Sequence, residues 1–209
     1  MKVKTKVEEQ YDRLAEIYDR RWYAYVLNTL MVLRDYLHLS GHETILDVAC
    51  GTGELERMLI DNYPDLNITG VDISEKMLEV ARSKFSHHNQ IEFLKSSINT
   101  LPFPDSSFDI IVTASAFHYF DNPIDALQEM KRVLKPTGKV IIMDWCRDFW
   151  FCKVLDLVLK LSDPAYTTCY NQRELHSFLR KSGFQVTREE RIRPHFLWGL
   201  MMATGTPYK

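Results

Sequence analysis

A short apolar run that ends in a glycine turn places the strongest constraint on how this 209-residue chain can fold. Residues 44–49 read Thr-Ile-Leu-Asp-Val-Ala, and the turn Cys50-Gly-Thr-Gly53 follows directly. A segment with helical spacing then runs through about Asn62. Glycine allows a sharp turn and a close approach of the backbone to a ligand, because it has no Cβ. A buried strand, a glycine turn and a helix in this order are typical of nucleotide-binding α/β sheets.

The rest of the chain repeats this alternation of strands and helices. Further apolar runs predict strands at residues 67–72, 91–94, 108–113 and 139–143, and helices begin after Ser74 and at Pro123. A helical insert at roughly residues 145–166 and a helix at about 172–181 come next, followed by strands at 185–192 and 196–204. The short link between the last two strands permits only an antiparallel hairpin. The sequence therefore predicts an α/β fold with a seven-stranded, mostly parallel sheet, helices on both faces and an antiparallel C-terminal hairpin.

The N-terminal part of the chain is predicted to be helical. Apolar residues recur at helical spacing over residues 7–39, and Ser40-Gly41 stops the pattern. No internal repeat and no long linker rich in proline, glycine or serine divides the chain. We therefore expect one domain that spans residues 1–209.

Charge and cysteine content argue against several partners. The formal net charge of −2 offers no strong field for nucleic acid, and the basic residues of 188–193 alternate with Glu189 and Glu190. The four cysteines have no metal-site spacing, so we expect no metal and a reduced, cytoplasmic setting. We find neither an apolar signal peptide nor the ~20-residue apolar run of a membrane span. Peripheral membrane contact through residues 149–161 stays open, although such a stretch is more often a core-facing helix.

An acid at the end of the second strand suggests a nucleoside ligand. Asp72 stands 21 residues after Gly51, where a carboxylate accepts hydrogen bonds from ribose hydroxyls. A dinucleotide site needs a small residue at the third position of G-x-G-x-x-G, but Glu56 stands there, and Glu54 follows Gly53 directly. Carboxylates at this turn repel pyrophosphate, so a phosphate-free ligand with an ammonium and a sulfonium fits better. An NAD(P)-dependent oxidoreductase stays the alternative.

Four motifs in register resemble the class I S-adenosylmethionine-dependent methyltransferases, and most closely their small-molecule "type 11" group, which includes ubiquinone and menaquinone methyltransferases. The motifs are Asp47–Gly53, Val71–Leu78, Leu101–Asp109 and Leu134–Gly138. They cover roughly residues 40–145. The resemblance implies a Rossmann-like fold, S-adenosyl-L-methionine as cofactor and S-adenosyl-L-homocysteine as product.

The resemblance also implies which residues hold the methionine and ribose parts of the cofactor. Ala49, Gly51 and Gly53 would wrap the methionine portion, and Asp47 would support its amino end, directly or through water. Asp72 would hold the ribose hydroxyls.

The adenine and the sulfur would contact residues from three later segments. Ile73 and Met77 would flank the adenine, although Met77 is equally well explained as helix core. Relatives usually carry an acid where Ser97 stands, so the neutral hydroxyl should bind the adenine amino group more weakly. The N–H of Ile98 would bind a ring nitrogen. Ser115, just after the fourth strand, would lie near the cofactor.

Two residues are candidates for a catalytic role. His118 lies in the loop 114–120, which by position faces the methyl group, and its imidazole is suited to remove a proton. A purely structural histidine is the alternative. Tyr18 belongs to a segment, residues 1–40, that resembles the helical lid of relatives; the alternative is an aromatic stripe that packs on the sheet.

The acceptor is expected to be a small molecule, and its identity stays open. The insert at 145–170 is expected to lie over the substrate site and contains many aromatic residues: Trp145, Phe149, Trp150, Phe151, Tyr166 and Tyr170. They suit a flat quinone-like or lipid-like acceptor, a methylated amine, or simply a core. A non-catalytic module that only binds the cofactor is a further alternative. The sequence does not decide the oligomeric state.

Overall fold

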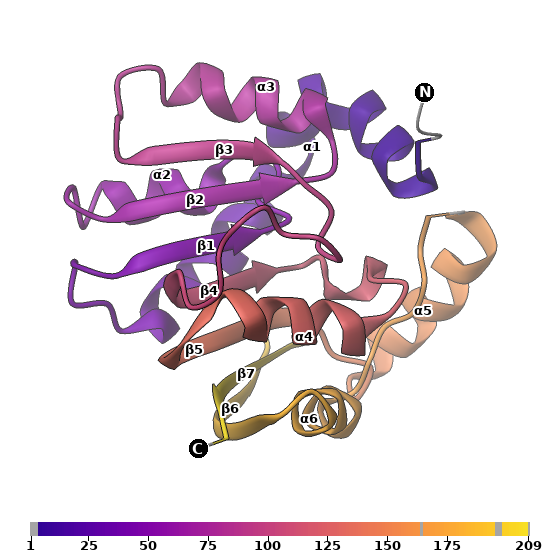
Figure 1. The fold of residues 1–209 in the computed structure, drawn as a ribbon. Helices are drawn as coiled ribbons and strands as arrows, with labels where there is room; N and C mark the ends of the chain where they lie inside the picture. The colour runs from indigo at the N-terminus through magenta and orange to yellow at the C-terminus, as the bar shows by residue number, and fades with distance from the viewer. Residues whose placement is uncertain (1–3, 164, 195–197, 209) are drawn as a thin grey trace.

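A seven-stranded mixed sheet forms the centre of the molecule (Figure 1). The computed structural model describes residues 4–163, 165–194 and 198–208. The strand order is β3-β2-β1-β4-β5-β7-β6, and only β7 runs antiparallel to its neighbours. The strands are β1 (Thr44–Val48), β2 (Asn67–Asp72), β3 (Ile91–Lys95), β4 (Phe108–Ala114), β5 (Leu134–Trp145), β6 (Phe184–Ile192) and β7 (Leu200–Pro207). The predicted architecture, including the antiparallel C-terminal hairpin, is confirmed.

Helices cover both faces of this sheet. One face carries α4 (Pro123–Val133) and α6 (Gln172–Lys181), and the opposite face carries α1 (Lys6–Leu37) and α2 (Glu54–Ile60). The helix α3 (Glu75–Lys84) packs beside β2 and β3, and α5 (Trp150–Ser162) stands beyond the ends toward which the arrows of β1 and β4 point (Figure 1). The N-terminal segment is one continuous helix of 32 residues.

Local signals in the sequence fix where these helices begin. The side chain of Ser74 caps α3, and Asn122 caps α4 with Pro123 at the first helical position. Asn171 and Glu174 form a reciprocal capping box at the start of α6. These caps supply hydrogen-bond partners for N–H groups that have none within the helix.

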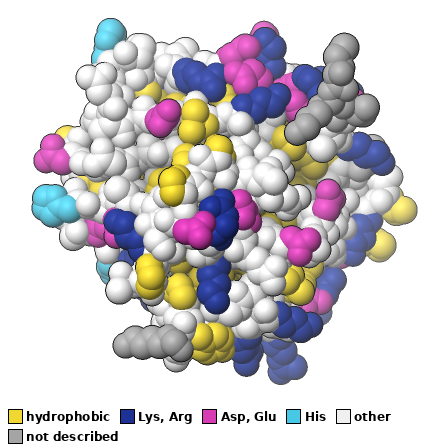
Figure 2. Space-filling view, viewed as in Figure 1, with side chains coloured by type: hydrophobic (Ala, Val, Ile, Leu, Met, Phe, Trp, Pro, Cys, Tyr) yellow, Lys and Arg dark blue, Asp and Glu magenta, His cyan; other side chains and the backbone are white. Residues whose placement is uncertain are grey.

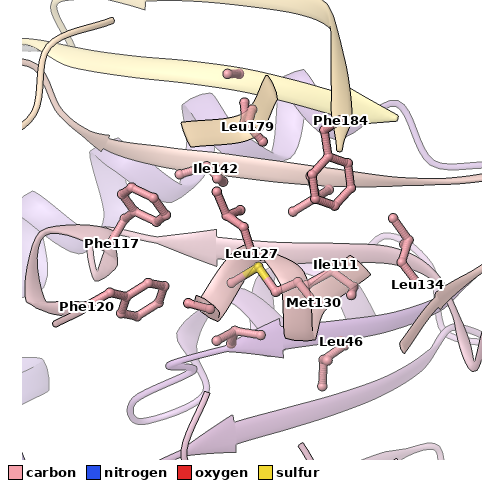
Figure 3. Packing of buried hydrophobic residues seen from close by; sticks show 14 of the residues in the cluster. Leu46, Ile111, Phe117, Phe120, Leu127, Met130, Leu134, Ile142, Leu179 and Phe184 are labelled. Atoms are coloured by element: carbon pink, nitrogen blue, oxygen red, sulfur yellow. The ribbon is translucent and has the colours of Figure 1, made fainter. Parts of the chain in front are cut away.

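The core lies on both faces of the central strands. Figure 3 shows side chains of α4, among them Leu127 and Met130, packing between Phe117, Phe120 and strand residues such as Ile111. Each fully buried side chain of this size contributes roughly 1.5–3 kcal/mol. These contacts fix the strand ends from which the functional loops leave the sheet.

The surface mixes the two signs of charge. In Figure 2, dark-blue and magenta side chains lie next to one another on the visible face. On β6, the guanidinium of Arg188 pairs with Glu190 at 2.5 Å and lies over the ring of Tyr36. Among the described residues, no helix is both long and apolar enough to cross a membrane.

The structure corrects three predicted boundaries. Strand β5 begins at Leu134, not at Lys139: Leu134 pairs with Phe108 and Lys139 pairs with Ile110, so residues 135–138 form an irregularity within the strand. The turn residues Pro-Thr-Gly are accommodated there and do not separate the helix from the strand.

The helix of the insert is shorter than predicted, and the last strand is shifted. Strand β5 continues to Trp145, so α5 begins only at Trp150 and ends at Ser162. Pairing with β5 and β6 carries β7 to Pro207, whereas residues 196 and 197 of the predicted strand lie outside the described residues.

Candidate functional site

The glycine turn after β1 has the conformation that its residues predict. Gly51 and Gly53 have φ values of 58° and 80°, in the left-handed region where glycine avoids strain. Ala49 shares this region with a φ of 62°, which is unfavourable for a residue with a Cβ. Its N–H, like that of Cys50, donates to the carbonyl of Val71. The turn is therefore held against the end of β2.

The carboxylate of Asp72 joins the ends of the first two strands. Its Oδ2 accepts a hydrogen bond from the N–H of Gly51 at 2.9 Å, and its Oδ1 accepts one from the N–H of Ser74 at 2.8 Å. A carboxylate has about four lone-pair sites, so each oxygen can accept another donor. Burial raises the pKa of Asp72, and these N–H donors act against that shift.

A cavity opens at the carboxyl ends of β1, β2 and β4, where ligands bind in open α/β sheets. Its lining combines the end of β2, the loop after β3, the loop after β4 and the first half of α1. The lining residues are Thr5, Val7, Tyr11, Tyr18, Val48, Ala49, Val71, Asp72, Ile73, Ser96, Ser97, Ile98, Asn99, Ala114, Ser115, Ala116, Tyr119, Phe120 and Asp121. One cavity thus reaches from the acid of β2 to an aromatic wall.

Three tyrosines form this aromatic wall. The rings of Tyr11 and Tyr119 meet edge to face with centroids 5.6 Å apart, and Tyr18 lies 6.1 Å from Tyr11. Burial raises the pKa of Tyr11 and Tyr18 well above their ordinary value, and that of Tyr119 to about 12. At neutral pH all three keep their hydroxyl proton, so they can donate hydrogen bonds but cannot act as bases.

Polar contacts tie α1 across the cavity. Asp19 accepts a hydrogen bond from the hydroxyl of Thr52 at 2.5 Å and pairs with Lys84 at 2.6 Å. Asp12 accepts a hydrogen bond from the hydroxyl of Ser74 at 2.6 Å. These contacts place the first half of α1 over the glycine turn and the end of β2.

A family model for a methyltransferase domain matches residues 46–142 of this chain. A demethylmenaquinone methyltransferase of Thermotoga maritima is 34% identical over 148 residues, which make up 69% of this chain but only 60% of that relative. A second protein of that name, from Leptospira interrogans, is 29% identical, with 86% of this chain and 84% of the relative covered.

A solved structure of an S-adenosylmethionine-dependent methyltransferase from Thermotoga maritima has the same fold, with a TM-score of 0.76, 22% identity, and coverage of 95% of this chain and 98% of that one. The chain is a methyltransferase, and in its fold it resembles the S-adenosylmethionine-dependent methyltransferases. Its cofactor is S-adenosylmethionine, and the comparisons favour this interpretation over the oxidoreductase alternative.

The methyltransferase brings many of the predicted cofactor residues to one cavity. Ala49, Asp72, Ile73, Ser97, Ile98 and Ser115 line it, as does Tyr18. Asp47 and Gly51 line a smaller cavity, which shares Tyr18, Ala49, Ala114 and Ser115 with the first. Gly53 lies beside Phe85 and Phe93, and Met77 is 1% exposed; neither lines the two cavities.

Ser115 belongs to a network that the sequence did not indicate. Its hydroxyl lies 2.7 Å from the hydroxyl of Tyr25, which also accepts a hydrogen bond from the indole N–H of Trp145 at 2.6 Å. Asn99 lines the main cavity. Neither Tyr25 nor Asn99 belongs to a motif that is recognisable in the sequence. Apolar spacing placed Tyr25 on a helix but gave no sign that it faces β4.

His118 lies behind the aromatic wall of the methyltransferase. It is 2% exposed and does not line the cavity; its ring stacks on Trp145 with centroids 4.5 Å apart. The Nδ1 atom lies 2.8 Å from Oδ1 of Asp144, whose Oδ2 accepts the N–H of His118. A carboxylate can only accept, so Nδ1 carries the proton, and a neutral ring has its lone pair on Nε2. Nε2 is buried and has no hydrogen-bond partner among the described residues.

Two acids lie buried beneath the glycine turn. Asp47 is 3% exposed and Glu56 is fully buried, with both carboxyl oxygens unpartnered among the described residues. Gly70 makes room for Glu56, because a Cβ there would lie 2.8 Å from its Oε1. Burial raises the pKa of Glu56 to about 8, and burial with the neighbouring acids raises that of Asp47 well above its usual range.

The two glutamates of the turn do not act as expected from the sequence. Glu54 pairs with Lys84 at 2.6 Å and with Arg57 at 2.8 Å, which offsets its charge. Glu56 points into the core and does not face the mouth of the turn. These two side chains therefore do not provide the repulsion of pyrophosphate that was predicted from the sequence.

The aromatic residues of the insert mostly form a core. None of the six predicted residues lines the main cavity. Tyr166 packs with Cys152 and Cys169, and Tyr170 packs against Phe117. Trp150 is exposed.

Proposed function

We propose that this methyltransferase methylates a small, electron-rich aromatic molecule, with a reduced quinone-like ring as the preferred acceptor. One observation carries the proposal: the cavity that contains Asp72 continues to the wall of Tyr11, Tyr18 and Tyr119. Flat apolar rings pack well on such a wall, and the tyrosine hydroxyls can donate hydrogen bonds to ring oxygens. The names of the two demethylmenaquinone methyltransferases support the same class of acceptor.

The proposed binding mode follows the lining of the cavity. Asp72 accepts hydrogen bonds from the ribose hydroxyls, and Ile73, Ser97 and Ile98 surround the adenine, whereas Met77 is buried in α3. Ala49, Gly51 and Gly53 shape the turn around the methionine end, near Asp47. Ser115 lies where the ends of β1 and β4 meet. The first half of α1 acts as a lid, because Asp12 and Asp19 tie it to the far side of the cavity.

S-adenosylmethionine supplies an electrophilic methyl group when it is bound. On transfer, the S–CH₃ bond would break with its electron pair left on sulfur, and an electron-rich carbon or oxygen of the acceptor would form the new bond to the methyl carbon. The protein must align the acceptor and exclude water, and alignment alone can lower a barrier by roughly 7–11 kcal/mol. Methylation at a ring carbon also requires that the proton on that carbon leaves.

We propose His118 as the group that takes this proton. Asp144 fixes the ring so that Nε2 carries the lone pair. Buried polar atoms without a partner are rare and call for an explanation, and an interaction made only in the reacting complex is one. Tyr119 and Trp145 border the ring, so Nε2 reaches the acceptor when one of these side chains moves. Tyr18 donates a hydrogen bond to the acceptor.

A small-molecule acceptor also fits the charge of the chain better than nucleic acid does. The net charge is −2, and basic residues of β6 such as Arg188 are paired with acids.

The cysteines support the cytoplasmic setting that we propose for this protein. All four are buried, and none forms a disulfide.

The test is release of S-adenosylhomocysteine from labelled S-adenosylmethionine with three acceptors: a reduced naphthoquinol, its oxidised quinone and an aromatic amine. We expect product with the naphthoquinol only, since the oxidised ring is electron-poor. Product with the amine alone would refute the proposed acceptor class. Cofactor binding without product from any acceptor would favour the non-catalytic alternative.

A further inference from the structure

Helix α5 carries an unusually exposed apolar surface. Of the ten large hydrophobic side chains that are exposed in the described residues, five belong to this 13-residue helix. Each of the five is more than half exposed, and Leu161 reaches 84%. They are Trp150, Val154, Leu157, Val158 and Leu161. We call these five residues the α5 stripe.

The α5 stripe is continuous along one side of the helix. At about 100° per residue, its five members fall within about 100° of the helix circumference. Two lysines, Lys153 and Lys160, are both exposed and lie together along one edge of the stripe, about 40–60° beyond Leu157 at the same spacing. At the N-terminal end, the guanidinium of Arg193 lies 4.8 Å from the ring centroid of Phe149, the residue that precedes the helix.

The opposite side of α5 is anchored to the protein. Asp156, the one acidic residue of the helix, is 7% exposed and accepts hydrogen bonds from the hydroxyl of Tyr166 and the N–H of Cys169, both at 2.8 Å. Cys152 is buried beside it. The helix therefore cannot turn its stripe inward without breaking these bonds, so the outward position of the stripe is part of the fold.

Charge decides which surface can cover the stripe. Asp156 is buried and pairs with Lys160 at 2.8 Å, so the exposed charges of the helix are Lys153 and the already paired Lys160. Packing two antiparallel copies of α5 about a twofold axis would bring the two Lys153 side chains to the same side of the pair, with no exposed acid of either helix beside them. An anionic lipid surface offers both an apolar phase for the stripe and phosphates for the lysines. At the right of Figure 2, where α5 lies, yellow side chains stand next to dark-blue ones.

We propose that α5 is a peripheral membrane-binding helix that lies in the plane of an anionic bilayer, with the α5 stripe among the acyl chains and Lys153 and Lys160 at the phosphates. A helix of 13 residues is about 20 Å long, which suits binding in the interface. This inference does not depend on methyl transfer.

The position of α5 would also guide an acceptor to the cavity; this step rests on the proposed function. Asp163, which follows the helix, accepts a hydrogen bond from Gln10 of α1 at 3.0 Å and one from the hydroxyl of Tyr119 at 3.5 Å. Tyr119 belongs to the wall of the cavity. A bilayer on the stripe therefore lies next to the aromatic end of the cavity, where an apolar acceptor that is dissolved in lipid can enter.

Vesicle flotation with the full chain tests the proposal. Phosphatidylcholine vesicles with roughly 30% phosphatidylglycerol should bind the protein at least about tenfold more tightly than vesicles of phosphatidylcholine alone. The double variant Leu157→Gln/Leu161→Gln should lose about tenfold or more in affinity, and Lys153→Glu about tenfold on anionic vesicles only. The matched control Met31→Gln/Tyr208→Gln changes two exposed apolar residues elsewhere and should bind like the wild type.

Three results would overturn the proposal: no binding to anionic vesicles, an equal loss in the control variant, or a wild-type dimer that Leu157→Gln/Leu161→Gln converts to a monomer. The last would assign the stripe to a second copy of the chain. Binding of S-adenosylmethionine and turnover of a water-soluble naphthoquinol should be unchanged in the double variant, so loss of membrane binding is distinguishable from failure of the proposed function.

Discussion

The N–H of Gly51 donates a hydrogen bond to Oδ2 of Asp72 at 2.9 Å, which joins the turn after β1 to the acid at the end of β2. The variant Asp72→Ala removes this bond and the proposed ribose acceptors together. We expect its dissociation constant for S-adenosylmethionine to rise at least about tenfold to a hundredfold, because even one hydrogen bond to a charged group contributes roughly 1.5–3 kcal/mol. Asp72→Asn should be affected less, and the exposed Asp65→Ala not at all. Calorimetry measures all three; equal affinities would remove Asp72 from the cofactor site.

The buried Glu56 should make stability depend on pH. Its pKa is raised from 4.5 to about 8, so the folded state retains a proton that the unfolded state releases. The resulting stability is complete below about pH 4.5 and is lost as the pH rises through about 8. Glu56→Gln is neutral throughout, so its free energy of unfolding should fall less between acid and alkaline pH, by about 1–3 kcal/mol. Urea titrations at both ends of this range measure the difference.

The exposed Glu92→Gln is the control for this experiment and should follow the wild type. Parallel pH profiles for Glu56→Gln and the wild type would show that the buried carboxyl does not retain its proton.

The contacts of Asp19 should slow the escape of the cofactor. Asp19→Ala removes the bond to Thr52 and the ion pair with Lys84. We expect the dissociation rate of S-adenosylmethionine to rise about three- to tenfold, since two partly exposed polar contacts are worth about 1 kcal/mol. Stopped-flow displacement measures this rate. The exposed Glu16→Ala lies on the same helix and should leave it unchanged; a similar rise in both variants would indicate a general loosening of α1.

The proposed role of His118 as proton acceptor can be separated from its structural role by substitution. In His118→Asn the amide can replace Nδ1 as donor to Asp144, but nothing replaces Nε2. We expect kcat to fall about a hundredfold or more, with the cofactor's dissociation constant unchanged. Asp144→Asn should also lower kcat, because it favours the wrong tautomer. A His118→Asn enzyme that keeps kcat within about threefold would leave His118 with a packing role.

Local patterns were sufficient to predict the sheet and the glycine turn. The run Ile45–Val48 and the turn through Gly53 depend on neighbours in sequence, and so do the caps at Ser74 and Asn122. The predicted start of β5 was wrong because Pro136 and Gly138 are typical turn residues, whereas the pairing of β5 with β4 accommodates them within the strand.

Contacts between distant segments explain what the sequence could not predict. The inward direction of Glu56 depends on the space at Gly70, and the offset of the Glu54 charge depends on Lys84. The burial of His118 depends on Asp144 and Trp145, which belong to another strand. These contacts join residues that are far apart in the sequence, so no sequence motif predicts them.

A crystal structure with S-adenosylhomocysteine is the sharpest test of the proposed cofactor site. We predict both ribose hydroxyls within hydrogen-bond distance of Asp72, the adenine beside Ile73 and Ile98, and the sulfur facing the wall of Tyr18 and Tyr119. Density for the ligand at any other place in the protein, or an empty cavity at saturating ligand, would show that this cavity is not the cofactor site.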